Sequence, residues 1–163
     1  MKRLQHELQY PGRTVEEVAA MLTDPAFRKA VADYQQTLRN EATVTPDGGG
    51  HTVLLEYAHG TDRVPSFARK FVGEEIPIRQ VERWSADHTA DIEVTIPGKP
   101  GEISGSALLD QRGEIAVETV DLSVRVGIPL VGGKIEDLIA GLLLKAFKAE
   151  NKVGTKWLAG EWT

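Results

Sequence analysis

The chain opens with an alternation of apolar and polar residues that predicts a β-strand. One face of this strand holds Leu4, His6, Leu8 and Tyr10, and the other holds only polar residues. Because successive side chains of a strand point to opposite sides, the first set is expected on a covered face. Pro11-Gly12 then ends the strand.

Two short helices are predicted directly after this strand. Thr14 and Glu17 have the spacing of a capping box, and apolar residues follow at helical spacing as far as Leu22. Asp24-Pro25 combines an N-cap residue with a first-turn proline, which indicates that a second helix begins there. The apolar stripe of this second helix comprises Phe27, Ala30, Val31 and Tyr34.

Further stretches along the chain have the pattern of strands. They are Leu38–Thr45, His51–Ala58, Ile76–Ala86, Thr89–Ile96, Glu102–Asp110 and Ile115–Val126. Turn-forming residues separate them, and the short spacings favour an antiparallel meander. In the last stretch the apolar parity shifts after Val117, which predicts a bulge at Thr119 and a bend in the sheet.

A short amphipathic helix is predicted between Arg63 and Gly73, where it interrupts the series of strands. Its apolar positions are Val64, Phe67, Ala68, Phe71 and Val72. Two interpretations stay open, because long excursions in compact domains are often functional. The helix is either a flap that packs on the core or a lid over a cavity.

The most apolar part of the chain, from Pro129 to Leu158, predicts one long amphipathic helix. Its apolar face comprises Ile135, Leu138, Ile139, Leu142, Leu143, Ala146, Phe147, Ala149 and Val153. Glu150 falls inside this apolar arc, where a carboxylate is costly unless it is paired or hydrated. Gly132-Gly133 lacks the spacing of a phosphate-binding loop, and we interpret it as a tight turn with a close approach to the sheet.

Together these elements predict a single α+β domain over residues 1–163. A curved antiparallel sheet has a concave face to cover, and the C-terminal helix is long enough to lie across it. Small residues at Gly105 and Ala107 leave two outcomes open. Either the helix approaches the sheet closely there, or a cavity remains beneath it.

Composition limits the classes of function. The 163 residues carry a formal net charge of −5, without the basic stripe that is typical of nucleic-acid binders. No cysteine is present, which excludes disulfides, thiolate metal sites and a cysteine nucleophile. The sequence indicates neither a signal peptide nor a membrane span, so we expect a cytoplasmic protein that does not bind nucleic acid.

Few residues have the pattern of a catalytic or metal site. The histidines form no HxH or HExxH pattern and no acidic cluster has metal-loop spacing, so we expect no metal and no cofactor. Ser104-Gly105-Ser106 lies in a predicted strand and lacks the nucleophile-elbow pattern. His6 is either a hydrogen-bonded core histidine or a polar group in a ligand cavity.

Three segments of the chain resemble an uncharacterised family of bacterial single-domain proteins in the START-like superfamily. They are KRLQHELQYPG, VPSFARKFVG and PLVGGKIEDLIAGLLLKAF, and the resemblance extends over essentially the whole chain. It implies a helix-grip fold, in which a curved sheet of about seven strands wraps around the long helix and a hydrophobic cavity lies between them. Members of the superfamily carry lipids, sterols, polyketides or quinones, and some are cyclases or dehydratases.

The resemblance leads to three hypotheses of function. The first is binding or transport of a hydrophobic small molecule or lipid between sheet and helix. The second is an enzyme of the cyclase or dehydratase type, with His6 and Glu150 as acid and base, although no shared motif identifies catalytic residues. The third is a protein-interaction module whose cavity is vestigial.

The binding hypothesis assigns residues to each wall of the cavity. The sheet wall would comprise Ile92, Val94, Ile103, Ala107 and Leu109, the helix wall Leu138, Leu142, Leu143 and Phe147, and the lid Phe67 and Phe71. Burial of apolar ligand surface, at about 25 cal/mol per Å², would supply the affinity. His6, Tyr57 or Glu150 would orient a polar end of the ligand.

Overall fold

Seven antiparallel strands form one sheet in the computed structural model, which describes residues 1–163. The strands are β1 (Lys2–Pro11), β2 (Arg39–Asp47), β3 (Gly50–Gly60), β4 (Glu75–Trp84), β5 (Thr89–Thr95), β6 (Glu102–Arg112) and β7 (Ile115–Arg125). Their order in the sheet is β1-β7-β6-β5-β4-β3-β2, so the predicted meander is confirmed from β2 to β7. The first strand pairs with the last, an arrangement that the local patterns did not specify.

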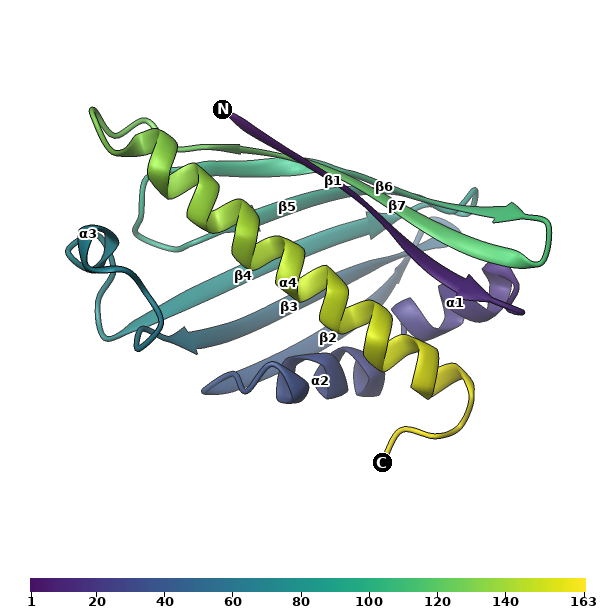
Figure 1. The fold of residues 1–163 in the computed structure, drawn as a ribbon. Helices are drawn as coiled ribbons and strands as arrows, with labels where there is room; N and C mark the ends of the chain where they lie inside the picture. Colours follow the sequence, from purple (N-terminus) through teal and green to yellow (C-terminus); the bar gives the residue numbers. More distant parts are fainter.

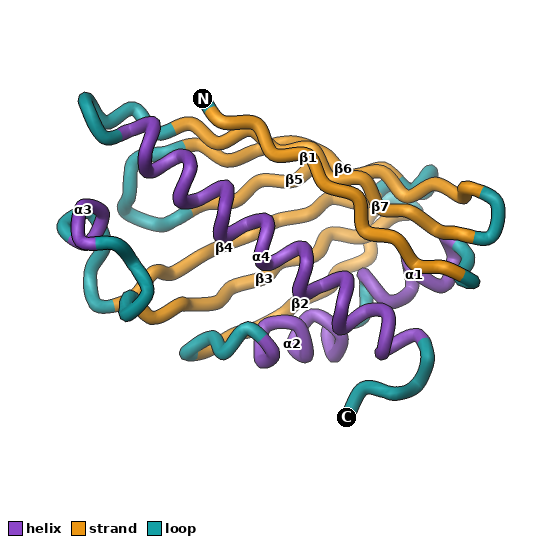
Figure 2. Tube along the Cα trace, in the orientation of Figure 1, coloured by secondary structure: helices purple, strands orange, loops and turns teal.

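The long helix α4 (Gly132–Leu158) lies diagonally across one face of the sheet (Figure 1). α1 (Val15–Leu22) and α2 (Pro25–Tyr34) follow β1, and α2 packs between β2 and α4. The short helix α3 (Ser66–Arg69) stands at the opposite end of the molecule, beside the start of α4 (Figure 2). The α+β architecture and its helix-grip arrangement are therefore as predicted.

The helix starts follow the capping signals in the sequence. The backbone N–H of Glu17 donates to the Thr14 hydroxyl at 3.2 Å, and the Thr14 N–H donates back to the Glu17 carboxylate at 3.1 Å. Asp24 accepts a bond from the N–H of Ala26 at 2.9 Å. α3 is shorter than predicted, since Pro65 at its N-cap provides no side-chain hydrogen bond to stabilise its first turn.

The bulge predicted at Thr119 is wrong. β7 pairs with β1 and β6 in constant register along its length, with Thr119 opposite Glu7 and Leu108. The apolar alternation changes along β7 because one of the alternating buried positions is occupied by the charged residue Glu118. A carboxyl at a covered position breaks the apolar alternation without changing the backbone.

Two glycines have roles that differ in part from their interpretation. A Cβ at Gly132 would lie 2.5 Å from the Val126 carbonyl oxygen, which confirms a close approach at the start of α4. The left-handed turn residue before the helix is Leu130, at φ 70°, and not a glycine. At Gly105 a Cβ would collide with the backbone of β7 at Asp121, so this glycine accommodates a neighbouring strand and not the helix.

Gly154 allows the C-terminal half of α4 to pack tightly on β1 and α1. An added Cβ would lie 2.9 Å from Cε1 of the buried Tyr10 ring and 3.0 Å from Cε of Met21. We expect Gly154→Ala to lower the free energy of unfolding by about 1–3 kcal/mol, because overpacking outweighs the higher helix propensity of alanine. Urea denaturation monitored by circular dichroism measures this change.

Gly141→Ala provides the matched control on the same helix. Gly141 is exposed and an added Cβ would meet no atom within 4 Å. This variant should gain about 0.5–1 kcal/mol from helix propensity alone. An equal gain at both positions would show that the Tyr10 ring moves aside at little cost.

Candidate functional site

An apolar cleft lies between the N-terminal half of α4, the sheet and the α3 segment. It contains about 950 Å³ of space between atoms, the solvent at its mouth included, of which about 100 Å³ can hold the centre of a water molecule. Of its 21 lining residues, 18 are hydrophobic. The helix side of the cleft comprises Ile135, Leu138, Ile139, Leu142, Leu143 and Ala146.

The other walls of the cleft come from four strands and three connecting segments. Tyr57, His59, Ile76, Ile78, Val94 and Ile103 line it from the sheet, Val64, Ala68, Phe71 and Val72 from the α3 segment, and Ile96, Lys99, Pro100, Val126 and Ile128 from the loops after β5 and β7. The C-terminal half of α4 has a different surrounding. There Phe147 and Val153 are buried in the main core with residues such as Leu8 and Phe27.

A second, smaller cavity adjoins the inner end of the cleft. Tyr57, Leu143 and Ala146 line both spaces, so the two are neighbours beneath α4. The smaller cavity contains about 580 Å³ between atoms, its opening to solvent included, and its walls are more polar. Its polar and charged lining residues are Arg28, Gln35, Asn40, Glu41, Tyr57, Gln80 and Glu150.

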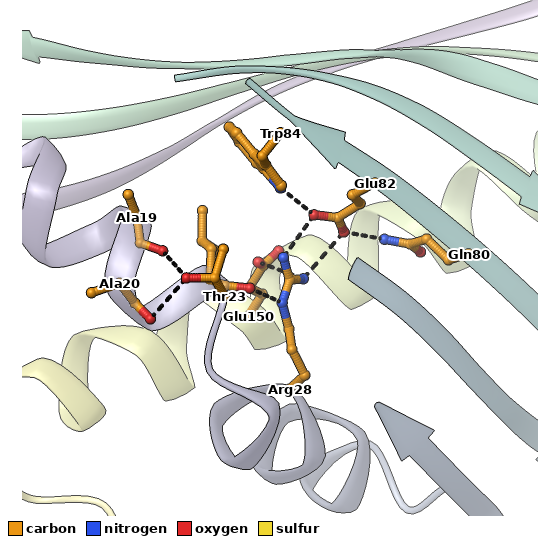
Figure 3. A network of polar contacts seen from close by, with 9 residues as sticks. Ala19, Ala20, Thr23, Arg28, Gln80, Glu82, Trp84 and Glu150 are labelled. Carbon is orange, nitrogen blue, oxygen red and sulfur yellow. Dashed lines mark hydrogen bonds and ion pairs between the residues drawn. The ribbon is translucent and has the colours of Figure 1, made fainter. Parts of the chain in front are cut away.

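A buried ion-pair cluster forms one side of this smaller cavity. Arg28 from α2 donates from Nη2 to Glu82 on β4 at 2.7 Å, and from Nη1 to Glu82 at 3.2 Å and to Glu150 on α4 at 3.4 Å. Figure 3 shows the guanidinium between the two carboxylates. The side chains of Arg28 and Glu82 are each 4% exposed, which makes this a rare fully buried pair.

Neighbouring groups form further hydrogen bonds with Arg28 and Glu82. The Arg28 Nε–H donates to the Leu22 carbonyl at 2.8 Å, and Gln80 and Trp84 donate to the two oxygens of Glu82 at 2.6 and 2.9 Å. Glu82 therefore accepts bonds at both oxygens and remains an effective counter-ion. Burial lowers the pKa of Arg28, but the carboxylates around it raise the pKa by more, so Arg28 stays charged.

Two carboxyl groups of the cluster lack full compensation. Burial raises the pKa of Glu150 to about 7, with Arg28 opposing this shift and Glu82 adding to it. Burial and the nearby Glu150 and Glu82 also raise the pKa of Glu118 well above its ordinary value. Oε1 of Glu118 is buried without any hydrogen-bond partner. Both carboxyl groups therefore hold a proton to higher pH than an exposed glutamate does.

The aromatic residue at the junction of the two cavities is Tyr57. Its ring makes an edge-on contact with His59 at 5.4 Å between centroids. Burial raises the pKa of the Tyr57 hydroxyl, and Glu82 and Glu150 raise it further. Burial lowers the pKa of His59, so this imidazole is neutral at pH 7.

Comparison with known proteins identifies the family. A family model described as "Protein of unknown function (DUF2505)" matches residues 5–158. The chain belongs to this family. No curated protein sequence matches the chain.

Solved structures show which fold this DUF2505 protein shares. TTHA0849 from Thermus thermophilus is 15% identical with a TM-score of 0.65, over 99% of this chain and 100% of that one. Norcoclaurine synthase from Thalictrum flavum is 16% identical with a TM-score of 0.61, over 93% and 85%. A START superfamily protein from Mycobacterium smegmatis is 12% identical with a TM-score of 0.59, over 97% of both chains. At these identities the similarity establishes the START-like fold.

The cleft of this DUF2505 protein brings together half of the predicted cavity residues. Tyr57, Phe71, Val94, Ile103, Leu138, Leu142 and Leu143 line it, and Phe147 and Glu150 line the smaller cavity. Ile92, Ala107 and Leu109 lie in the packed core instead. They share a face with Val94 and Ile103, but they lie further along β5 and β6, away from the cleft.

Phe67 and His6 also lie outside both cavities. Phe67 is partly exposed, with the ammonium of Lys134 at 5.9 Å from its ring centroid, so within α3 only Ala68 contributes to the cleft. His6 is half-buried on β1, and burial followed by the nearby Lys148 lowers its pKa. The predicted acid-base pair of His6 and Glu150 therefore does not converge in one cavity.

Three residues of the polar cluster were missed by the sequence analysis. Glu82 has a detectable signal, since it alternates with Ile76, Ile78 and Trp84 on the covered face of β4. Glu118 causes the shift in apolar parity that was interpreted as a bulge at Thr119. Arg28 has no local signal, because its position on α2 borders the apolar stripe and only the sheet beneath it decides that it is buried.

Neither a metal site nor a membrane-spanning helix is evident in the fold. No group of three or more acidic or histidine side chains is arranged to hold a metal ion. None of the helices is both long and apolar enough to cross a membrane. The cytoplasmic location stays a prediction.

Proposed function

We propose that this DUF2505 protein binds a hydrophobic small molecule or lipid in the cleft between α4 and the sheet. The observation that carries the proposal is the lining of this open cleft, in which 18 of the 21 residues are hydrophobic. Ligand pockets are typically concave and mostly apolar, as this cleft is.

The helix that bounds the cleft supports the proposal. Leu142 is 43% exposed, although it belongs to the apolar face that covers the sheet. Leu138, Ile139 and Ala146 are also only partly buried. An apolar face left partly unpacked over a cleft gains stability when an apolar ligand covers it. The same open space favours binding over an interaction module with a vestigial cavity.

Binding of an apolar dye in the cleft provides a direct test of the proposed function. We expect the environment-sensitive apolar dye 1-N-phenylnaphthylamine to bind with increased fluorescence. Leu142→Glu should weaken this binding about tenfold or more, because a carboxylate at the cleft wall must be desolvated when the dye binds. The measurement is a fluorescence titration at constant protein concentration.

Leu108→Glu is the matched control for this experiment. Leu108 on β6 is 42% exposed, almost the same as Leu142, and it lines neither cavity. The control should bind the dye as the unmodified protein does. Equal weakening in both variants, or no dye binding at all, would refute the proposed function.

A further inference from the structure

Building on the proposed function, we propose that the ligand carries a basic amine, and that its ammonium group binds at the inner end of the cleft against Glu150. The class of ligand is thus an apolar amine, as distinct from a fatty acid, an acidic phospholipid or a neutral lipid. Three features of the smaller cavity support this inference. They are its charged residues, its oxygen atoms without a hydrogen-bond donor, and its position next to the cleft.

The charge around this cavity is acidic. Arg28 is the only cation among its lining residues, and Glu150 and Glu41 are the anions. Glu82 is close enough to raise the pKa of Glu150, and both of these groups raise the pKa of the buried Glu118. A buried region with more carboxyl groups than cations attracts a cation and repels a carboxylate or phosphate.

Arg28 is poorly placed to bind an anionic ligand. Each of its three guanidinium nitrogens already donates to a carbonyl or carboxylate oxygen within the protein, at Leu22, Glu82 or Glu150. One N–H, on Nη2, has no partner within the protein, but an anion bound there would lie beside the carboxylate of Glu82 and be repelled by it. The one cation of the cavity therefore serves as an internal counter-ion.

Several residues that line the cavity carry oxygen atoms that accept no hydrogen bond within the protein, Asn40 Oδ1 among them. Glu150 is only 6% exposed, and its Oε1 accepts from Arg28 whereas its Oε2 has no donor. Gln80 donates its Nε2–H to Glu82, which leaves its Oε1 without a donor. The Tyr57 hydroxyl also lines the cavity. A primary ammonium has three N–H donors and no acceptor, so it suits a wall with unused acceptors.

The two cavities are neighbours, and the inference requires one molecule to reach from the cleft into the smaller cavity. Tyr57, Leu143 and Ala146 line each of them, so an apolar chain in the cleft leads to the polar wall beside Glu150. The one lysine or arginine that lines the cleft is Lys99, on the loop after β5. If the smaller cavity did not take part in binding, a fatty acid could instead place its carboxylate beside Lys99.

Chain-matched amphiphiles test this inference on the full protein. Decylamine, decanol and decanoate should each displace 1-N-phenylnaphthylamine, and decylamine should bind about tenfold more tightly than decanol at pH 8. Decanoate should bind most weakly. An order in which decanol or decanoate equals or exceeds decylamine would overturn the inference.

A single conservative variant separates a specific contact with Glu150 from the effect of the protein's overall negative charge. Glu150→Gln should lower the affinity for decylamine about tenfold and leave the affinity for decanol unchanged. Glu114→Gln is the matched control, because Glu114 is exposed between β6 and β7 and lines neither cavity, so its charge is screened by water and salt. A similar loss in both variants would contradict a specific contact with Glu150.

The pH dependence gives a readout that needs no variant. The groups that influence Glu150 or its neighbours are Arg28 on α2, Glu82 on β4, Glu118 on β7, Tyr57 on β3 and Tyr10 on β1. Because Glu150 must lose its proton to pair with an ammonium, decylamine affinity should rise as the pH increases from about 6 to about 8. Decanol affinity should not rise, and a flat decylamine profile would contradict the inference.

The outcomes for the two proposals are distinguishable. If neither the dye nor any of the three amphiphiles binds, the proposed function fails. If the dye and decanol bind and Leu142→Glu weakens them, but decylamine shows no preference, only the amine inference fails.

Discussion

Arg28→Met is expected to lower the free energy of unfolding by about 3–5 kcal/mol at pH 7. The substitution keeps an unbranched side chain of similar length but leaves Glu82, which is 3% exposed, without its cation. Removal of one partner from a buried ion pair costs this much because the remaining charge is uncompensated. The expected loss is a large share of the stability of an ordinary domain, and urea denaturation measures it.

The adjacent residue supplies the control. Lys29 pairs with Asp33 at 2.9 Å, but the side chains of both residues are more than half exposed, so Lys29→Met should change stability by less than about 1 kcal/mol. The double variant Arg28→Met with Glu82→Gln should recover part of the loss, since it removes the stranded charge. A loss below about 1 kcal/mol for Arg28→Met alone would show that Glu82 is neutral or hydrated.

The second large effect is a decrease in stability as the pH rises from about 4.5 to about 7. The folded state raises the pKa of Glu150 from 4.5 to about 7, so the folded chain holds a proton that the unfolded chain has released. The stabilisation is complete below the pKa of the unfolded chain and is lost as the pH passes through the folded value. A shift of this size corresponds to about 3 kcal/mol.

Urea denaturation at several pH values measures this slope. Glu150→Gln should remove most of it, and a residual slope of the same sign should remain from Glu118, whose pKa is also raised. Asp121→Asn is the control, because Arg3 lowers the pKa of Asp121 and this group titrates below the range measured. If Glu150→Gln retains the full slope, the Glu150 carboxyl is not the group that holds the proton.

Local patterns predicted most secondary-structure elements correctly. The capping box at Thr14 and the Asp24-Pro25 start both appear where the sequence places them, since N-caps depend on neighbouring residues alone. The strands of the meander also appear, because alternation depends only on which side of the backbone faces the core. The long apolar stripe of α4 predicted that this helix covers the sheet, and the structure confirms it.

The site was predictable only in part. Leu138 and Leu142 on α4 and Val94 and Ile103 on the sheet line the cleft as proposed, since they belong to the faces that meet there. Ile92, Ala107 and Leu109 have the same pattern but are packed. Alternation identifies a face of a strand, whereas the distance between helix and sheet along that face depends on the twist of the sheet and the angle at which α4 crosses it.

The sequence by itself determined the element order, the helix caps, the apolar face of α4 and the presence of a carboxylate within that face at Glu150. Only the tertiary structure decided what surrounds that carboxylate. Arg28, Glu82 and Glu118 come from three elements that are far apart in the chain, and the folding of the sheet around α4 brings them within interaction distance. The pKa of a buried group and the ligand it accepts depend on such neighbours, which local patterns do not encode.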